Sequence, residues 1–118
     1  MKILVVDDDL LAAEMTGAIL EACGYQPLIA ENAIAGLELL AAEPQIGLVV
    51  SDLNMPLVSG LDFLRELREQ GSQLPFILLS GDSCETQSAS QPAPDRSLLK
   101  DFDLVESLPH AIESLLQR

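Results

Sequence analysis

Three short apolar stretches without alternating polar residues constrain the fold of this chain more than any other feature. They are Ile3–Val6, Ile46–Val50 and Pro75–Ser80. A strand that is apolar on both faces has to be covered on both faces, as in a parallel sheet. Because helical patterns alternate with such strands along the chain, the sequence predicts an α/β fold. We expect a doubly wound parallel sheet with right-handed crossovers and helices on both faces.

Apolar residues at helical spacing predict three helices with recognisable ends. The first closes at Gly24, and the second follows Asn32 and ends before Pro44. The third opens at the capping sequence Ser59–Asp62 and stops at Gly71. The residues expected on the three apolar stripes are Leu11, Met15, Ala18, Ile19 and Ala22; Ile34, Leu37, Leu40 and Ala41; and Leu61, Leu64 and Leu67.

The remaining elements set the expected strand order. A short strand is predicted around Gln26–Ala30, a last strand over Leu98–Lys100 and a last helix over Asp103–Gln117. Proline is tolerated in an edge strand and not in a central one, so Pro27 places the second strand at an edge. This favours the order 2-1-3-4-5 of a flavodoxin-like five-stranded sheet. Pro109 inside the last helical pattern predicts either a separate first turn or a bend.

Composition limits the classes of function. With 118 residues, of which 48% are hydrophobic, the chain is expected to form one domain over residues 1–118. Its net charge of −13 argues against direct DNA binding and against binding to anionic membranes, and favours a divalent cation or a basic protein partner. No apolar run approaches the ~18 residues of a membrane span. Because Cys23 and Cys84 are lone cysteines and the N-terminus does not resemble a signal peptide, we expect a cytoplasmic protein.

Polar residues follow the predicted strands at the edge where a ligand would bind. In such a sheet, ligands bind beyond the carboxyl ends of the strands, at the point where the strand order reverses. The residues at these ends are Asp7, Asp8 and Asp9, then Ser51 and Asp52, then Ser80 and Gly81, and finally Lys100. Any one of them has an ordinary explanation, and Asp9 is expected to be only a helix N-cap. Together they predict a Mg²⁺ site, because Mg²⁺ binds a few carboxylates and leaves positions for water and phosphate oxygens.

Four motifs resemble the receiver domain of bacterial two-component response regulators over essentially the whole chain. They read ILVVDDD, VVSDLNMPLVSG, FILLSG and LLKDF. The resemblance implies that Asp52 accepts a phosphoryl group from a phosphohistidine on a sensor histidine kinase or a histidine phosphotransfer protein. It implies a phosphoacceptor that promotes its own phosphorylation and dephosphorylation and acts on a downstream protein target. An enzyme with a separate substrate is not expected.

The same resemblance assigns roles to the other pocket residues. Asp7 and Asp8 would hold Mg²⁺ together with Asp52, and Asn54 would contribute its backbone carbonyl. Ser80 would hydrogen-bond the phosphoryl group, and Lys100 would pair with its charge. Beside them, Gly81 would leave room for the imidazole of the donor and for an attacking water molecule.

The sequence departs from the family pattern in three places. Ser97 occupies the position where the family usually has a switch tyrosine or phenylalanine, and Asp101 replaces the usual proline after Lys100. The segment 82–96 is poor in apolar residues, so its helix, the fourth along the chain, is expected to be short, loosely held or partly disordered. All three departures lie on the face that usually carries the signal outward. They predict retained chemistry with an atypical output switch, in which an order–disorder balance of this segment shifts.

Three alternatives remain at this point. A pseudo-receiver would bind proteins without being phosphorylated, but the set of Asp52, Ser80 and Lys100 argues against it. An Mg²⁺-dependent phosphohydrolase that forms an aspartyl phosphate needs a second acid two residues after its nucleophile, and Asn54 stands there. A flavodoxin would need a hydroxyl-rich phosphate loop after the first strand and aromatic residues around its flavin, and aromatics make up only 3% of the chain.

Overall fold

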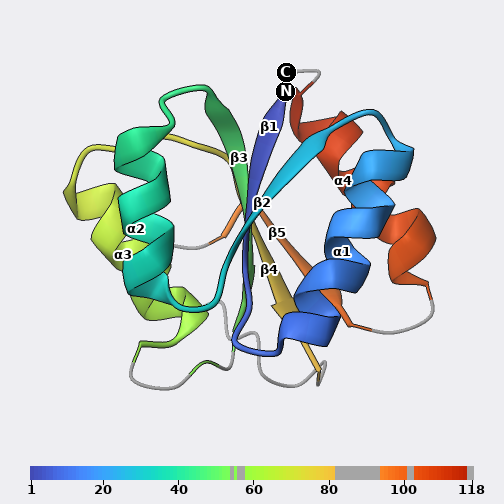
Figure 1. The fold of residues 1–118 in the computed structure, drawn as a ribbon, viewed down its shortest axis with the longest axis horizontal. Coiled ribbons are helices and arrows are strands. Elements are labelled where there is room, and N and C mark those ends of the chain that lie inside the picture. Colours follow the sequence, from blue (N-terminus) through green and yellow to red (C-terminus); the bar gives the residue numbers. More distant parts are fainter. Residues whose placement is uncertain (54, 56–57, 82–93, 101–102, 117–118) are drawn as a thin grey trace.

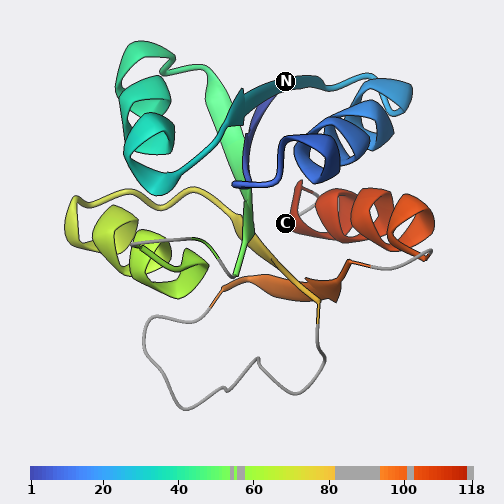
Figure 2. The same ribbon diagram turned by 60° about the horizontal axis from the view of Figure 1, so that its bottom comes forward.

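The computed structural model describes residues 1–53, 55, 58–81, 94–100 and 103–116. Its elements, in chain order, are β1 (Lys2–Val6), α1 (Leu10–Ala22), β2 (Gln26–Ala30), α2 (Ala33–Ala42), β3 (Ile46–Asp52), α3 (Gly60–Glu69), β4 (Phe76–Ser80), β5 (Arg96–Leu99) and α4 (Leu104–Leu116). All five strands are parallel and lie in the order β2-β1-β3-β4-β5. Helices α1 and α4 cover one face of the sheet, and α2 and α3 cover the other (Figure 1, Figure 2). The predicted flavodoxin-like fold is confirmed.

Two apolar cores lie on opposite faces of the sheet, as the unbroken apolar strands require. Between the sheet and α1 and α4, side chains such as Val5, Val50 and Leu108 are fully buried or nearly so. On the other face, Phe63 of α3 meets Phe76 of β4 edge to face, with ring centroids 5.9 Å apart. Such aromatic pairs contribute about 0.5–1.5 kcal/mol beyond the area that they bury.

The ends of the first three helices follow the capping signals in the sequence. Asp9, Asn32 and Ser59 are the N-caps of α1, α2 and α3, and each side chain accepts a hydrogen bond from a backbone N–H of the first turn. Gly24 and Gly71, with φ of 91° and 90°, follow α1 and α3 in the left-handed conformation that glycine adopts most easily. The predicted N-cap role of Asp9 is confirmed.

The predicted apolar stripe of α1 is not its buried face. Leu11 and Met15 are 67% and 64% exposed, whereas Ala13 and Gly17 are among the buried residues. The small residues let the helix lie close to the sheet: a Cβ on Gly17 would already contact the Pro27 ring at 3.4 Å. Since α1 is apolar on nearly every side, periodicity alone could not identify the face that contacts the core.

The apolar stripe expected on α2 is also only partly buried. Ala33 and Gly36 are the buried residues of this helix, whereas Ile34 is 59% exposed. Leu37 and Leu40 are half-buried, and Ala41 is exposed. The predicted stripe therefore lies at the edge of the helix face that contacts the sheet, and Ala33 and Gly36 form the centre of that face.

The last part of the chain differs in its boundaries from the expectation. Strand β5 begins at Arg96, two residues earlier than expected, and its register pairs Ser80 with Leu99. Helix α4 is continuous through Pro109, which excludes the first of the two predicted alternatives, a separate first turn. The predicted short or disordered fourth helix falls largely on residues 82–93, which lie outside the described residues.

One aspartate joins three elements at the start of β5. Asp95 Oδ2 accepts hydrogen bonds from the backbone N–H of Phe76 at 2.8 Å and from the Arg68 guanidinium at 3.4 Å. The backbone N–H of Asp95 in turn donates to the Phe76 carbonyl at 2.9 Å. These bonds connect β5 to β4 and α3.

Cys23 is exposed with a free thiol, and Cys84 lies outside the described residues. Among the described helices, none is both long enough and apolar enough to span a membrane.

Candidate functional site

Two aspartates are buried where the central strands β1 and β3 end. Val6 of β1 is in register with Ser51 of β3, so the residues that follow them, Asp7 and Asp52, lie side by side. They are only 2% and 6% exposed. Asp8 is exposed, yet one oxygen from each of the three carboxylates lies within 4.8 Å of the others. The predicted meeting of residues 7, 8 and 52 is therefore present in the structure.

Lys100 supplies a positive charge to the two buried carboxylates. Its Nζ donates a hydrogen bond to Asp7 Oδ2 at 2.9 Å and lies 3.3 Å from Asp52 Oδ1. Burial disfavours the charged ammonium, but the hydrogen bond to Asp7 and the charges of Asp52 and Asp7 outweigh it, so the pKa of Lys100 is raised above its usual value. The ammonium is therefore charged at neutral pH.

Backbone hydrogen bonds hold these side chains in place. The backbone N–H of Lys100 donates to the Ser80 carbonyl at 2.8 Å, which continues the pairing of β4 and β5 by one residue. The other oxygen of Asp7, Oδ1, accepts the backbone N–H of Asp9 at 2.9 Å. The N-cap residue of α1 thus also orients a carboxylate of the site, a link that sequence reasoning did not identify.

Ser80 and Gly81 lie at the end of β4, beside β3. Ser80 is 1% exposed, whereas Gly81 is exposed. A Cβ added to Gly81 would meet no heavy atom of the described residues within 4 Å, so their packing does not require glycine here.

Gly60 is a supporting residue whose importance the sequence analysis underestimated. Its backbone N–H donates to the Leu53 carbonyl at 2.8 Å, which joins the start of α3 to the end of β3. A Cβ at Gly60 would lie 2.7 Å from Leu78 Cδ1 and closer still to the carbonyl oxygen of Asp52. The signal was present in the sequence, because a glycine directly after an N-cap serine is a poor choice for a helix unless space is short.

Comparison with known proteins decides the family. The sequence model of the response regulator receiver domain matches residues 3–113. The chain belongs to this family. This receiver domain is 36% identical over 120 residues to the response regulator MprA of Mycobacterium avium and 34% identical over 125 residues to a probable transcriptional regulatory protein of Picosynechococcus. The two matches include 100% and 99% of this chain. They include only 52% and 49% of the two relatives, so the chain spans about half of their length.

A solved structure agrees with the family assignment. The response regulator protein TrrA of Thermotoga maritima, crystallised in complex with Mg²⁺-BeF, has a TM-score of 0.87 and 31% identity to the receiver domain. The match covers 97% of each chain.

The acidic cluster of the receiver domain fits a divalent cation. Three carboxylates, two of them buried, are opposed by the single ammonium of Lys100, and like charges at this spacing repel. Hard carboxylate oxygens with one exposed member, Asp8, suit an ion that keeps several water molecules. The site could thus hold Mg²⁺ with Asp7, Asp8 and Asp52 as ligands.

Of three further positions singled out in the sequence, the structure describes one. Ser97 lies on β5 in register with Leu78 and is exposed, so the position of the missing aromatic residue faces away from the core. Asn54, whose carbonyl is the remaining expected metal ligand, and Asp101 lie outside the described residues.

Proposed function

We propose that this receiver domain accepts a phosphoryl group on Asp52 from a phosphohistidine of a sensor histidine kinase or a histidine phosphotransfer protein, with Mg²⁺ as its cofactor. The observation that carries the proposal is the convergence of the Asp7, Asp8 and Asp52 carboxylates beside the Lys100 ammonium, at the end of the sheet. The similarity to TrrA, which was crystallised with Mg²⁺-BeF, supports it. We also propose a cytoplasmic location, because the phosphoryl donor of such a domain acts there.

Each side chain of the pocket would have a separate role in phosphoryl transfer. An oxygen of Asp52 attacks phosphorus, the P–N bond to the histidine breaks, and the imidazole leaves with the electron pair and takes up a proton. Lys100 compensates the charge of the transferred oxygens, and the Ser80 hydroxyl donates to one of them. When bound, Mg²⁺ supplies the positive charge that lets an anionic nucleophile approach an anionic donor.

The product is an acyl phosphate, which hydrolyses readily and so suits a transient signal. The domain is then a phosphoacceptor, because the group it receives stays on its own side chain. Its output would act through the β5 and α4 surface without an aromatic rotamer, since Ser97 has no ring to move. A downstream protein is the proposed target.

Incubation with acetyl phosphate and Mg²⁺, followed by intact-mass spectrometry, tests the proposal. We expect the mass to rise by one phosphoryl group, and we expect EDTA to prevent this rise. A domain that never gains mass, although it is folded and binds Mg²⁺, would be a pseudo-receiver, and the proposal would be wrong.

Replacing Asp8 by asparagine should separate metal binding from folding. Asp8 is exposed, so Asp8→Asn should leave the unfolding temperature of the metal-free domain unchanged or slightly higher, because one repelling charge is gone. The affinity for Mg²⁺ should fall by about tenfold or more, since one carboxylate ligand is lost. Calorimetric titration with MgCl₂ measures this change.

Asp9→Asn is the matched control for Asp8→Asn. It makes the same change at the neighbouring residue, and asparagine caps a helix as well as aspartate does. We expect its Mg²⁺ affinity to stay within about twofold of the wild type, because Asp9 contacts Asp7 through its backbone and not through its carboxylate. Equal losses in both variants would show that only the total charge matters.

Gly81→Val should slow phosphorylation by a donor with a ring. Because a Cβ at Gly81 would meet no described residue within 4 Å, the variant should fold as the wild type does. Phosphoimidazole and phosphoramidate both transfer phosphorus from nitrogen, but only the first carries the ring. We expect Gly81→Val to reduce the rate with phosphoimidazole by about tenfold, through misplacement of the ring, and to leave the rate with phosphoramidate nearly unchanged. Equal effects on the two donors would contradict the proposed role of Gly81.

A further inference from the structure

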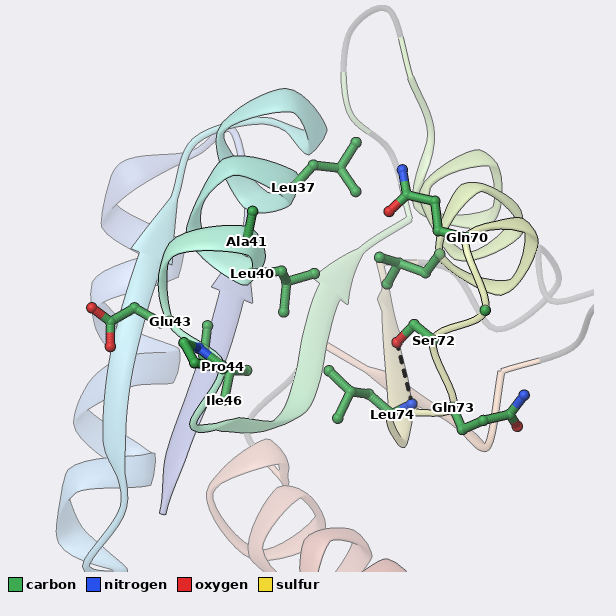
Figure 3. A pocket seen from close by; sticks show the side chains of 12 residues that line it. Leu37, Leu40, Ala41, Glu43, Pro44, Ile46, Gln70, Ser72, Gln73 and Leu74 are labelled. Atoms are coloured by element: carbon green, nitrogen blue, oxygen red, sulfur yellow. Dashed lines mark hydrogen bonds between the residues drawn. The ribbon is translucent and has the colours of Figure 1, made fainter.

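A groove separates α2 from α3 on the face of the sheet that these two helices cover. Two cavities lie along it, of about 450 and 350 Å³, and Leu37 lines both of them. The larger cavity is shown in Figure 3, where Leu37 and Leu40 of α2 lie across from Gln70, the C-cap of α3, with Leu74 below. The smaller one continues past Leu37 toward the N-terminal ends of the two helices.

The α2 wall of this groove is apolar. The helix reads AIAGLELLAA, and Glu38 is its single charged residue. Helices that are apolar all round are normally buried, but Ile34 is 59% exposed and Leu37 and Leu40 are only half-buried. Apolar surface along a groove of this kind typically marks a site of contact with another molecule.

The α3 wall is acidic. Asp62, Glu66 and Glu69 line the smaller cavity together with one cation, Arg65, which forms an exposed 3.5 Å ion pair with Asp62. Glu66 accepts a hydrogen bond from Gln70 at 3.0 Å. One wall thus offers apolar contacts, and the other offers carboxylates to a cation.

We propose that the α2–α3 groove binds an amphipathic helix with basic residues along one edge, supplied by a partner protein. Helices α2 and α3 each have 10 residues, so the groove is about 15 Å long and matches nearly three turns of a bound helix. Leucine-like side chains of the partner would contact the α2 wall, and its lysines or arginines would face the α3 wall.

Other occupants of the groove are disfavoured by charge. An anionic membrane, or a second copy of this chain with its net charge of −13, would be repelled by the acidic α3 wall. The groove contains none of the pocket residues, so this inference does not depend on phosphorylation.

A synthetic helical peptide made only of leucine and lysine, with its leucines on one face, serves as the probe. Its affinity for the whole domain is measured by fluorescence anisotropy, and its position by amide chemical shifts. We expect binding with shifts concentrated along α2 and α3. The double variant Glu66→Lys/Glu69→Lys should weaken binding by about tenfold or more, and Ile34→Ser by about fivefold. Asp52→Asn should bind the peptide as the wild type does, which keeps this test separate from the proposed phosphorylation.

Matched controls lie on α1, the other apolar helix. Glu14→Lys/Glu21→Lys changes the net charge by the same amount at two exposed positions, and Met15→Ser removes a side chain that is 64% exposed. We expect both to stay within about twofold of the wild type. Equal losses in groove and control variants, or shifts centred on α1, would overturn the proposal. So would a dimer in sedimentation velocity that Ile34→Ser dissociates, or binding to phosphatidylserine vesicles that this variant abolishes.

Discussion

Asp52→Asn is expected to abolish phosphorylation by acetyl phosphate completely. Asparagine keeps the shape of the side chain but removes the nucleophilic carboxylate, and no acyl phosphate can form without it. Intact-mass spectra after incubation with acetyl phosphate and Mg²⁺ should show a gain for the wild type and none for the variant. The variant should also be at least as stable as the wild type without metal, since it removes one of three clustered negative charges.

Asp62→Asn is the matched control for this result. Asp62 lies on α3 and is exposed, and its carboxylate forms an exposed ion pair with Arg65, of the kind that contributes little to stability. It should be phosphorylated as the wild type is. If Asp52→Asn still gained one phosphoryl group, peptide mapping would locate another acceptor and the assignment of Asp52 would fall.

Gly60→Ala is expected to destabilise the domain strongly, although alanine favours helices more than glycine does. Its Cβ would lie 2.7 Å from Leu78 Cδ1 and would collide with the backbone carbonyl of Asp52, which cannot move without disturbing β3. We expect a loss of roughly 2–3 kcal/mol, in the range of overpacked cores. Urea unfolding measures this loss. Because the collision is at Asp52 itself, the Mg²⁺ affinity of the folded fraction should fall as well.

Gly81→Ala provides the comparison for Gly60→Ala. It makes the same substitution at a glycine where an added Cβ meets no described residue within 4 Å. Its unfolding free energy should remain within about 0.5 kcal/mol of the wild type. If Gly60→Ala were equally harmless, the start of α3 would have to be free to move away from β3, and the close approach described above would be wrong.

The strands and the pocket could be predicted from the sequence because their signals are local. Unbroken apolar runs indicate central parallel strands, and Pro27 indicates an edge position for β2, which together favour the order that the sheet has. Once that order is known, residues 7 and 52 must end adjacent strands. The meeting of Asp7 with Asp52 was thus predictable before any distance was measured.

The faces of the helices could not be predicted in the same way. In α1, Ala13 and Gly17 contact the sheet because they are small, while the larger Leu11 and Met15 lie outside. A hydrophobic stripe predicts the buried face of a helix from the polarity of its residues. In α1 the buried face is instead determined by size, because only small residues allow the helix to pack close to the sheet. The need for glycine at position 60 is likewise a contact between elements distant in the sequence. The groove between α2 and α3 depends on the spacing of two helices, which cannot be predicted from a local sequence pattern.

The hydrogen bonds of Asp95 fix the position of β5 and therefore the position of Lys100 at its other end. Asp95 connects to Phe76 and Arg68 by three hydrogen bonds, and Lys100 continues the same strand pairing through Ser80. The register of β5, and with it the reach of the ammonium, is therefore fixed from residue 95 onward. The position of the ammonium thus depends on a carboxylate five residues earlier in the chain, where β5 begins.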